Sequence, residues 1–197
     1  MLVKQHSGEE QDLTSLRDEI ARNMDDGIHY FMRLSSTSGK NERHVSPMKN
    51  ADDIMDNLIK NKIFLQREYY REKDTYLILI PWNDKIEKRN EFRIFVKNGK
   101  LTGITQQWWS QCFNYSQEEL ILFQHSLENI SFLDKIPYPD YVGDVYIENG
   151  ECKLIEINPF GAHIGAGSGL YNWVDDFDIL YNLKSDLQFR YLSIVRI

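Results

Sequence analysis

Three oxygen-bearing side chains lie near the ends of two adjacent predicted strands. Glu156 and Asn158 are two residues apart, and because successive side chains of a strand alternate between faces, both are expected to point the same way. Asp144 lies on the preceding predicted strand, which Asn149-Gly150 joins to this one. Mg²⁺ prefers such oxygen ligands and fills its remaining octahedral positions with water or phosphate oxygens. The residues predict a magnesium site; a solvated hairpin followed by an Asn-Pro turn is the alternative.

The hairpin must meet a geometric condition for this site to form. With a regular two-residue turn at Asn149-Gly150, Asp144 would oppose Ile155, and Glu156 would lie on the other face. A three-residue connection with Gly150 in the left-handed conformation, or one β-bulge, brings both carboxylates to the same face. The site therefore predicts a positive φ at Gly150 or a bulge nearby.

A second group of candidates could bind phosphate. Arg33 ends the strand predicted over 28–34 and precedes a small polar loop that includes Ser35, Ser36 and Lys40. A cation beside exposed backbone N–H groups could hold phosphate oxygens. The loop lacks the spacing of a Walker A motif, so a plain surface loop is the alternative.

Arg93 lies within a strand predicted over 91–97. Alternation groups it with Phe95 and Lys97 on a face expected to carry charge, opposite a core face of apolar residues. It is either a surface ion-pair partner of Glu91 or a clamp on a phosphate or acceptor group.

The apolar run Leu77, Ile78, Leu79 and Ile80 predicts a buried strand that Pro81 ends. Free backbone groups of Ile78 to Ile80 could instead hydrogen-bond an adenine edge. Trp108-Trp109 is expected to fill the core or a partner surface rather than to stack on a base.

The remaining pattern indicates an α+β fold. Helices are predicted near 13–24, near 50–61 and from the capping box at Ser116 and Glu119. Asn98-Gly99 predicts a second hairpin, and the tail at 187–197 could return as a strand. Because helices and strands do not alternate regularly, a largely antiparallel arrangement is favoured over a doubly wound sheet.

Composition narrows the class of protein. The 197 residues, 42% hydrophobic, suffice for one domain of two lobes. A formal charge of −7 disfavours direct nucleic-acid binding and attachment to anionic membranes. Only Cys112 and Cys152 are present, without metal-site spacing, and no apolar run could span a bilayer or serve as a signal peptide. We expect a cytoplasmic protein.

Three blocks, taken in order, resemble the cell division cycle protein 123 family of the ATP-grasp superfamily. They are 30–36, 91–101 together with 104–106, and 144–146 together with 154–161. The resemblance implies one ATP-grasp domain over 1–197, with an N-terminal helix in 1–27 and lobes at approximately 28–75 and 76–197. It further implies largely antiparallel sheets with ATP and magnesium in a cleft between the lobes. The family's longer N-terminal part is reduced here to the predicted helix.

The resemblance also implies roles for particular residues. Asp144, Glu156 and Asn158 would hold magnesium, Arg33 and the following loop would contact phosphates, and Arg93 would face the same cleft. Arg33 and Glu156 stand where a lysine and an aspartate are expected in the family, which keeps each charge but alters its reach.

The resemblance implies an Mg-ATP-binding protein that is similar to the assembly chaperone of eukaryotic translation initiation factor two. The γ subunit of that factor is the candidate partner. An ATP-grasp ligase that joins a carboxylate to an amine through an acyl phosphate is the alternative, in which Arg93 would be catalytic and stabilise the transferred phosphoryl group. An interaction module with a purely structural nucleotide is the third possibility.

Overall fold

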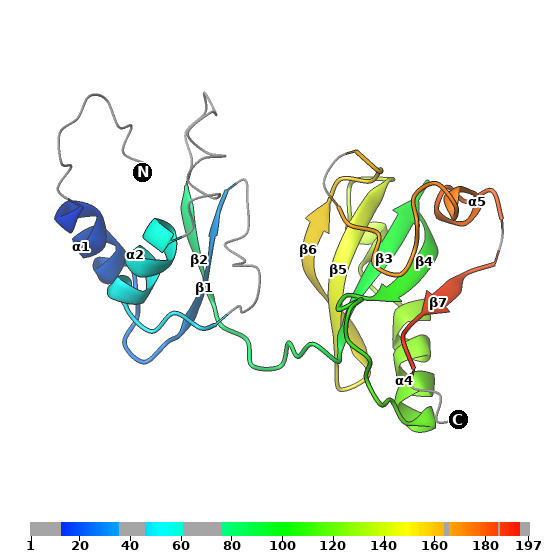
Figure 1. Ribbon diagram of the computed structural model, residues 1–197, viewed down its shortest axis with the longest axis horizontal. Helices are drawn as coiled ribbons and strands as arrows, with labels where there is room; N and C mark the ends of the chain where they lie inside the picture. Colours follow the sequence, from blue (N-terminus) through cyan, green and yellow to red (C-terminus); the bar gives the residue numbers. More distant parts are fainter. Residues whose placement is uncertain (1–12, 36–45, 61–75, 164–165, 185, 194–197) are drawn as a thin grey trace. The chain divides into compact units, whose positions relative to one another are not determined.

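The chain forms two compact units, Met1–Asn83 and Asp84–Ile197, in the computed structural model (Figure 1). Residues 13–35, 46–60, 76–163, 166–184 and 186–193 are described. The units divide between 83 and 84, whereas the sequence placed the lobe boundary at approximately 75 and 76. The reason is that strand β2 (Leu77–Pro81) pairs antiparallel with strand β1 (Tyr30–Leu34) and so belongs to the first unit. Among the described residues, no helix is long and apolar enough to cross a bilayer.

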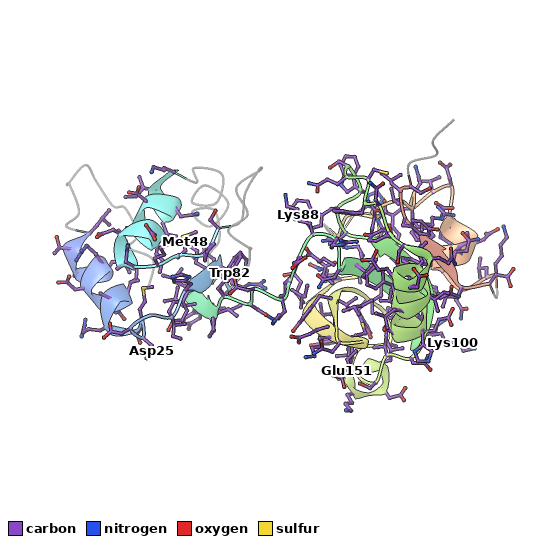
Figure 2. The ribbon with its side chains drawn as sticks, turned by 90° about the horizontal axis from the view of Figure 1, so that it is seen from below. Asp25, Met48, Trp82, Lys88, Lys100 and Glu151 are labelled. Atoms are coloured by element: carbon purple, nitrogen blue, oxygen red, sulfur yellow. The ribbon has the colours of Figure 1, made fainter. Side chains whose placement is uncertain are left out.

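In the first unit, helices α1 (Thr14–Arg22) and α2 (Ala51–Lys60) pack on one face of the two-stranded sheet (Figure 1). Asn50 caps the N-terminus of α2, because its Oδ1 accepts the Asp53 N–H at 2.9 Å. A main-chain bridge between Tyr30 and Met48 extends the sheet. Figure 2 labels Met48 and Trp82, which both belong to this unit. The core of this unit consists of Ile20, Met32, Leu34, Ala51, Ile54, Met55 and Leu58.

Strand β2 is buried on one face only, which corrects the expectation of a fully buried strand. Leu77 and Leu79 contact the core of the first unit, whereas Ile78 and Ile80 are 39% and 41% exposed. Among the described residues, the core of this unit lies on the face that carries Leu77 and Leu79. Because Arg33 pairs directly with Ile78, its side chain lies on the other face of the sheet, together with that of Ile78.

The second unit contains a five-stranded sheet in the order β6-β5-β3-β4-β7. Its strands are β3 (Glu91–Lys97), β4 (Lys100–Gln106), β5 (Tyr141–Glu148), β6 (Glu151–Asn158) and β7 (Gln188–Arg190). All neighbours are antiparallel except β4 and β7, which are parallel. The predicted hairpin at Asn98-Gly99 is confirmed: both turn residues have positive φ, 52° and 71°. The antiparallel α+β class is therefore correct.

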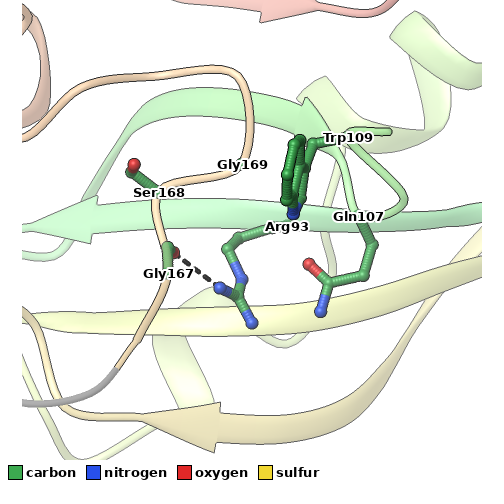
Figure 3. A pocket seen from close by; sticks show the side chains of 6 residues that line it. All are labelled: Arg93, Gln107, Trp109, Gly167, Ser168 and Gly169. Atoms are coloured by element: carbon green, nitrogen blue, oxygen red, sulfur yellow. Dashed lines mark hydrogen bonds between the residues drawn. The ribbon is translucent and has the colours of Figure 1, made fainter. Parts of the chain in front are cut away.

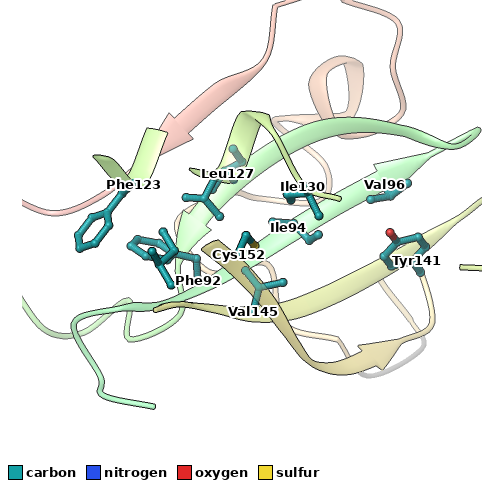
Figure 4. Packing of buried hydrophobic residues seen from close by; sticks show 11 residues of the cluster. Phe92, Ile94, Val96, Phe123, Leu127, Ile130, Tyr141, Val145 and Cys152 are labelled. Carbon is teal, nitrogen blue, oxygen red and sulfur yellow. The ribbon is translucent and has the colours of Figure 1, made fainter. Parts of the chain in front are cut away.

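Helix α4 (Gln117–Glu128) covers one face of this sheet, and the short 3₁₀ helix η1 (Leu133–Lys135) follows it. The capping box is confirmed, since Ser116 Oγ accepts the Glu119 N–H at 3.2 Å and Glu119 Oε2 accepts the Ser116 N–H at 2.8 Å. Figure 4 shows the resulting core, in which Phe92 and Phe123 have ring centroids 5.1 Å apart. Its other buried members are Ile94, Val96, Ile104, Leu127, Ile130, Tyr141, Val145, Ile147 and Cys152.

The opposite face of β3 is also covered, although the sequence predicted a charged surface there. Phe95 is fully buried, and its ring centroid lies 5.3 Å from that of Tyr171 and 5.5 Å from that of Trp173. The segment that carries these rings continues into helix α5 (Phe177–Leu180). Asp176 and Arg190 secure it to β7 through contacts of 2.7 and 2.8 Å. Arg93 consequently lies beside a packed segment rather than on an open face.

Candidate functional site

The hairpin between β5 and β6 meets the geometric condition set by the sequence. Its turn has two residues, Asn149 and Gly150, with φ of 52° and 79°. Val145 pairs with Leu154, but Asp144 pairs with Glu156, so Ile155 is an extra residue in the ladder. This bulge brings Asp144 and Glu156 to one face, as predicted. The bulge is decisive, because a regular ladder beyond the two-residue turn would have placed the Asp144 and Glu156 side chains on opposite faces of the sheet.

Asp144 is held in a dense network of hydrogen bonds and is 1% exposed. Arg93, its cross-strand partner on β3, donates from Nε to Oδ1 at 2.8 Å and from Nη2 to Oδ2 at 2.9 Å. Gln107 Nε2 donates to Oδ2 at 3.2 Å, and Asn158 Nδ2 lies 3.5 Å from the same oxygen. A buried carboxylate is tolerated only when it is paired and hydrogen-bonded, and the bidentate guanidinium supplies that compensation.

These residues fit a magnesium ion in type and placement. Asp144 and Glu156 face the same side, and Asn158, two residues beyond Glu156 on β6, shares that side. Because Asn158 donates to Asp144 through its amide nitrogen, its carbonyl oxygen is the group left to a cation. The described part of the chain has no group of three or more His, Cys, Asp or Glu that could hold a metal. The candidate set is thus two carboxylates and one amide, to be completed by water or phosphate oxygens.

A pocket of about 350 Å³ adjoins this network (Figure 3). Arg93 Nη1 donates to the carbonyl oxygen of Gly167 at 2.5 Å. A Cβ at Gly167 would stand 3.2 Å from that nitrogen, and one at Gly169 only 2.5 Å from Thr105 Cγ2. The loop therefore needs glycine to come this close to the sheet. The lining residues are Arg93, Gln107, Trp109, Gly167, Ser168 and Gly169.

Sequence reasoning did not identify Gln107 as a site residue. The sequence carried no signal for it, because a regular Asn98-Gly99 hairpin would set Ile104 opposite Arg93. A register shift between Phe95 and Val96 sets Thr105 there instead, so that Gln107, two residues further along, shares the face of Arg93.

The sequence predicted that Trp109 fills the core or a partner surface. Its side chain is 61% exposed at the pocket, so it does not fill the core, and the partner surface stays a prediction. Trp108 is half-buried, and its Nε1 donates to Glu91 Oε2 at 2.8 Å.

The candidates of the first unit form a separate group. Arg33 is half-buried, and its Nε lies 3.5 Å from the Leu34 carbonyl oxygen. Ser35 pairs with Tyr76: its Oγ accepts the Tyr76 N–H at 3.2 Å, and its own N–H donates to the Tyr76 carbonyl at 2.8 Å. Ser36 and Lys40 lie outside the described residues. The structure thus collects Arg33, Ser35 and the strand 77–81 in one unit, and Arg93, Asp144, Glu156 and Asn158 in the other.

Comparisons with known proteins agree with the resemblance drawn from the three sequence blocks. The family model D123 matches residues 46–195. A protein of Danio rerio named translation initiation factor eIF2 assembly protein is 37% identical over 91 residues, which cover 43% of this chain and 25% of that protein. The Candida albicans protein of the same name is 22% identical over 191 residues, covering 85% of this chain and 54% of that protein. The chain thus spans about a quarter to a half of these relatives.

Two solved structures of Cdc123 from Schizosaccharomyces pombe, one of them C-terminally truncated, share the fold. Their TM-scores are 0.67 and 0.66 at 19% sequence identity. Each match covers 92% of this chain and 78% of the solved chain. The chain therefore shares the α+β fold of Cdc123.

Proposed function

The chain belongs to the D123 family, and we propose that it binds Mg-ATP and assists the assembly of eIF2. The observation that carries the proposal is the bulged hairpin, which aligns Asp144 with Glu156 inside a fold shared with Cdc123. Relatives of this chain are named eIF2 assembly proteins, which supports eIF2 as the client. The γ subunit of that factor is the proposed direct partner.

In this proposal the two units contribute different contacts. Asp144, Glu156 and Asn158 hold the magnesium ion, which when bound neutralises phosphate charge. Arg33 and Ser35, with Ser36 and Lys40, contact the phosphates. The backbone of Ile78 to Ile80 meets the adenine edge, and among the described strands β2 is paired along one edge only, with β1.

Binding of Mg-ATP is tested by thermal shift, because a ligand at about one hundred times its Kd stabilises the folded state by about 2.7 kcal/mol. We expect ATP with magnesium to raise the melting temperature and ATP with a chelator to raise it less. Glu156→Gln should abolish the part of the rise in melting temperature that depends on magnesium. Glu151→Gln, at the exposed start of the same strand, is the matched control and should keep it. No shift at millimolar Mg-ATP would refute nucleotide binding.

The partner proposal rests on the exposed indole of Trp109. Aromatic side chains are common anchors at interface centres, so Trp109→Ala should weaken binding to the isolated γ subunit by roughly 2 kcal/mol, about thirtyfold. Because this side chain is 61% exposed, the melting temperature should change little. Absence of binding by the unsubstituted chain at micromolar concentrations would remove the chaperone proposal.

A ligase is the second candidate function, and the pocket beside Arg93 is the observation that favours it. A carboxylate or amine acceptor could occupy this space next to the proposed metal. A ligase would release ADP only when an acceptor is supplied and would form a ligated product. An assembly chaperone would show a partner-dependent change without such a product, so mass spectrometry of a reaction with candidate acceptors distinguishes the two functions.

A further inference from the structure

Three apolar side chains around helix α5 are exposed to solvent. Val174 is 79% exposed, Leu183 67% and Phe177 44%, and all three lie within ten residues of the chain. Main-chain hydrogen bonds hold them close together, because the Phe177 N–H donates to the Val174 carbonyl at 3.3 Å and the Leu183 N–H donates to the Asp178 carbonyl at 2.8 Å. Single exposed apolar side chains are ordinary, whereas a cluster of them marks an interaction site. We call these three residues the α5 patch.

The segment that carries the α5 patch is firmly held, so the exposure is not a consequence of loose packing. Asn172 Oδ1 accepts the Val174 N–H at 2.8 Å, and Asp176 Oδ2 accepts the Asn172 N–H at 2.8 Å. The Leu180 carbonyl accepts a hydrogen bond of 3.0 Å from Thr102 Oγ1 on β4, beside which α5 lies (Figure 1). A surface that is already ordered loses little conformational entropy when it binds a partner.

Phe177 is the best-placed anchor of the α5 patch. Its ring stacks on that of Tyr181, with centroids 4.1 Å apart and an angle of 21° between the ring planes. Tyr181 is in turn edge-on to Phe160, with centroids 5.2 Å apart, and Lys97 Nζ lies 5.5 Å from the Tyr181 centroid. One face of the Phe177 ring is therefore supported by this aromatic group, which leaves its remaining surface for a partner. Aromatic side chains of fixed orientation are common anchors at interface centres.

The charges around the α5 patch decide which kind of partner fits. Of the four aspartates in 174–190, two form ion pairs with Lys184 and Arg190. Among the described residues, the carboxylates of the other two, Asp175 and Asp186, have no ion-pair partner. These carboxylates repel nucleic acid, anionic lipid and a second copy of this chain, whose formal charge is −7. A partner that carries Lys or Arg beside its apolar side chains complements both features of the surface.

We propose that the α5 patch binds a basic amphipathic segment of a partner protein. The apolar side chains of that segment cover Val174, Phe177 and Leu183, and its Lys or Arg side chains lie near Asp175 and Asp186. This binding requires neither nucleotide nor metal and is therefore independent of the function proposed above.

The test measures binding of a fluorescently labelled peptide to the full chain by anisotropy, without nucleotide. The probe is a synthetic peptide of about 14 residues, about four helical turns, with leucines on one face and lysines on the other. A second peptide carries glutamate in place of every lysine. We expect the leucine–lysine peptide to bind about tenfold more tightly, because only this peptide complements the carboxylates. Equal affinity for the two peptides would overturn the proposal.

Two double variants locate the binding site. Val174→Ser with Leu183→Ser removes exposed apolar contacts and should weaken binding of the leucine–lysine peptide about tenfold. The melting temperature should change little, because both side chains are exposed. The matched control, Ile121→Ser with Tyr138→Ser, removes two side chains that are each 60% exposed in the same unit and should bind as the unsubstituted chain does. A loss of affinity that is the same in both double variants, or absent from the first, would refute the site.

A third double variant tests the contribution of charge. Asp175→Asn with Asp186→Asn keeps the apolar side chains and should weaken binding about fivefold, with a smaller dependence on salt. Unchanged affinity would overturn the choice of a basic partner.

Sedimentation velocity and vesicles that contain phosphatidylserine test the other occupants of the α5 patch. We expect the chain alone to remain a single copy and to leave the vesicles unbound, because like charges repel. Self-association or vesicle binding that Val174→Ser with Leu183→Ser abolishes would assign the patch to a second copy or to a membrane, and either result would contradict the proposal.

Discussion

Replacing Asp144 with alanine should destabilise the protein even in the absence of nucleotide. The substitution removes both acceptors of the Arg93 fork, at 2.8 and 2.9 Å, and leaves a guanidinium whose side chain is only 11% exposed without its counter-ion. Breaking a buried pair by removing one partner costs about 3–5 kcal/mol. At about 2–4 °C per kcal/mol for a chain of this length, the melting temperature should fall by about 6–20 °C.

The assay is urea and thermal unfolding of the chain without nucleotide, followed by circular dichroism. A double-mutant cycle gives a second test. The loss of unfolding free energy in the double variant Arg93→Gln with Asp144→Asn should be smaller than the sum of the losses in the two single variants, by a coupling energy of about 3 kcal/mol. A melting temperature for Asp144→Ala within about 2 °C of the unsubstituted chain, or an additive cycle, would refute the reasoning.

Two further predictions concern pH and thiol chemistry. Hydrogen bonds from Arg190 hold the pKa of Asp176 below its usual range, so this ion pair contributes stability above about pH 4 and loses it as the pH falls through the lower pKa of the folded state. Asp176→Asn should therefore cost about 2 kcal/mol in urea unfolding at pH 7 and progressively less below pH 4, and a cost independent of pH would contradict this. Burial raises the pKa of the Cys152 thiol to about 12, whereas Cys112 is exposed. A chromogenic disulfide reagent at pH 8 should modify one thiol in the native protein and a second only in denaturant; two rapid modifications would show that Cys152 is accessible.

Local sequence determined the features that depend on a few neighbouring residues. Asn98-Gly99 forms the predicted turn because asparagine and glycine adopt positive φ at low cost, and Ser116 with Glu119 caps α4 through their own backbone groups. The spacing of the acids even required a bulge, since side chains alternate strictly along a strand. The three blocks of residues also identified the family, because their order and spacing are specific in combination.

Tertiary structure decided which side chains meet. The alternation along β3 predicted which face of the strand carries Arg93, but it did not predict the ion-pair partner of Arg93. Strand order and register decide that partner, because they set Asp144, 51 positions away along the chain, opposite Arg93. Phe95 lies on the same face and is buried because a distant segment, carrying Tyr171, packs over it. Trp109, in the turn that follows β4, is exposed for the complementary reason. A large apolar side chain is buried only where another element packs over it, and the sequence of a turn does not reveal whether one does.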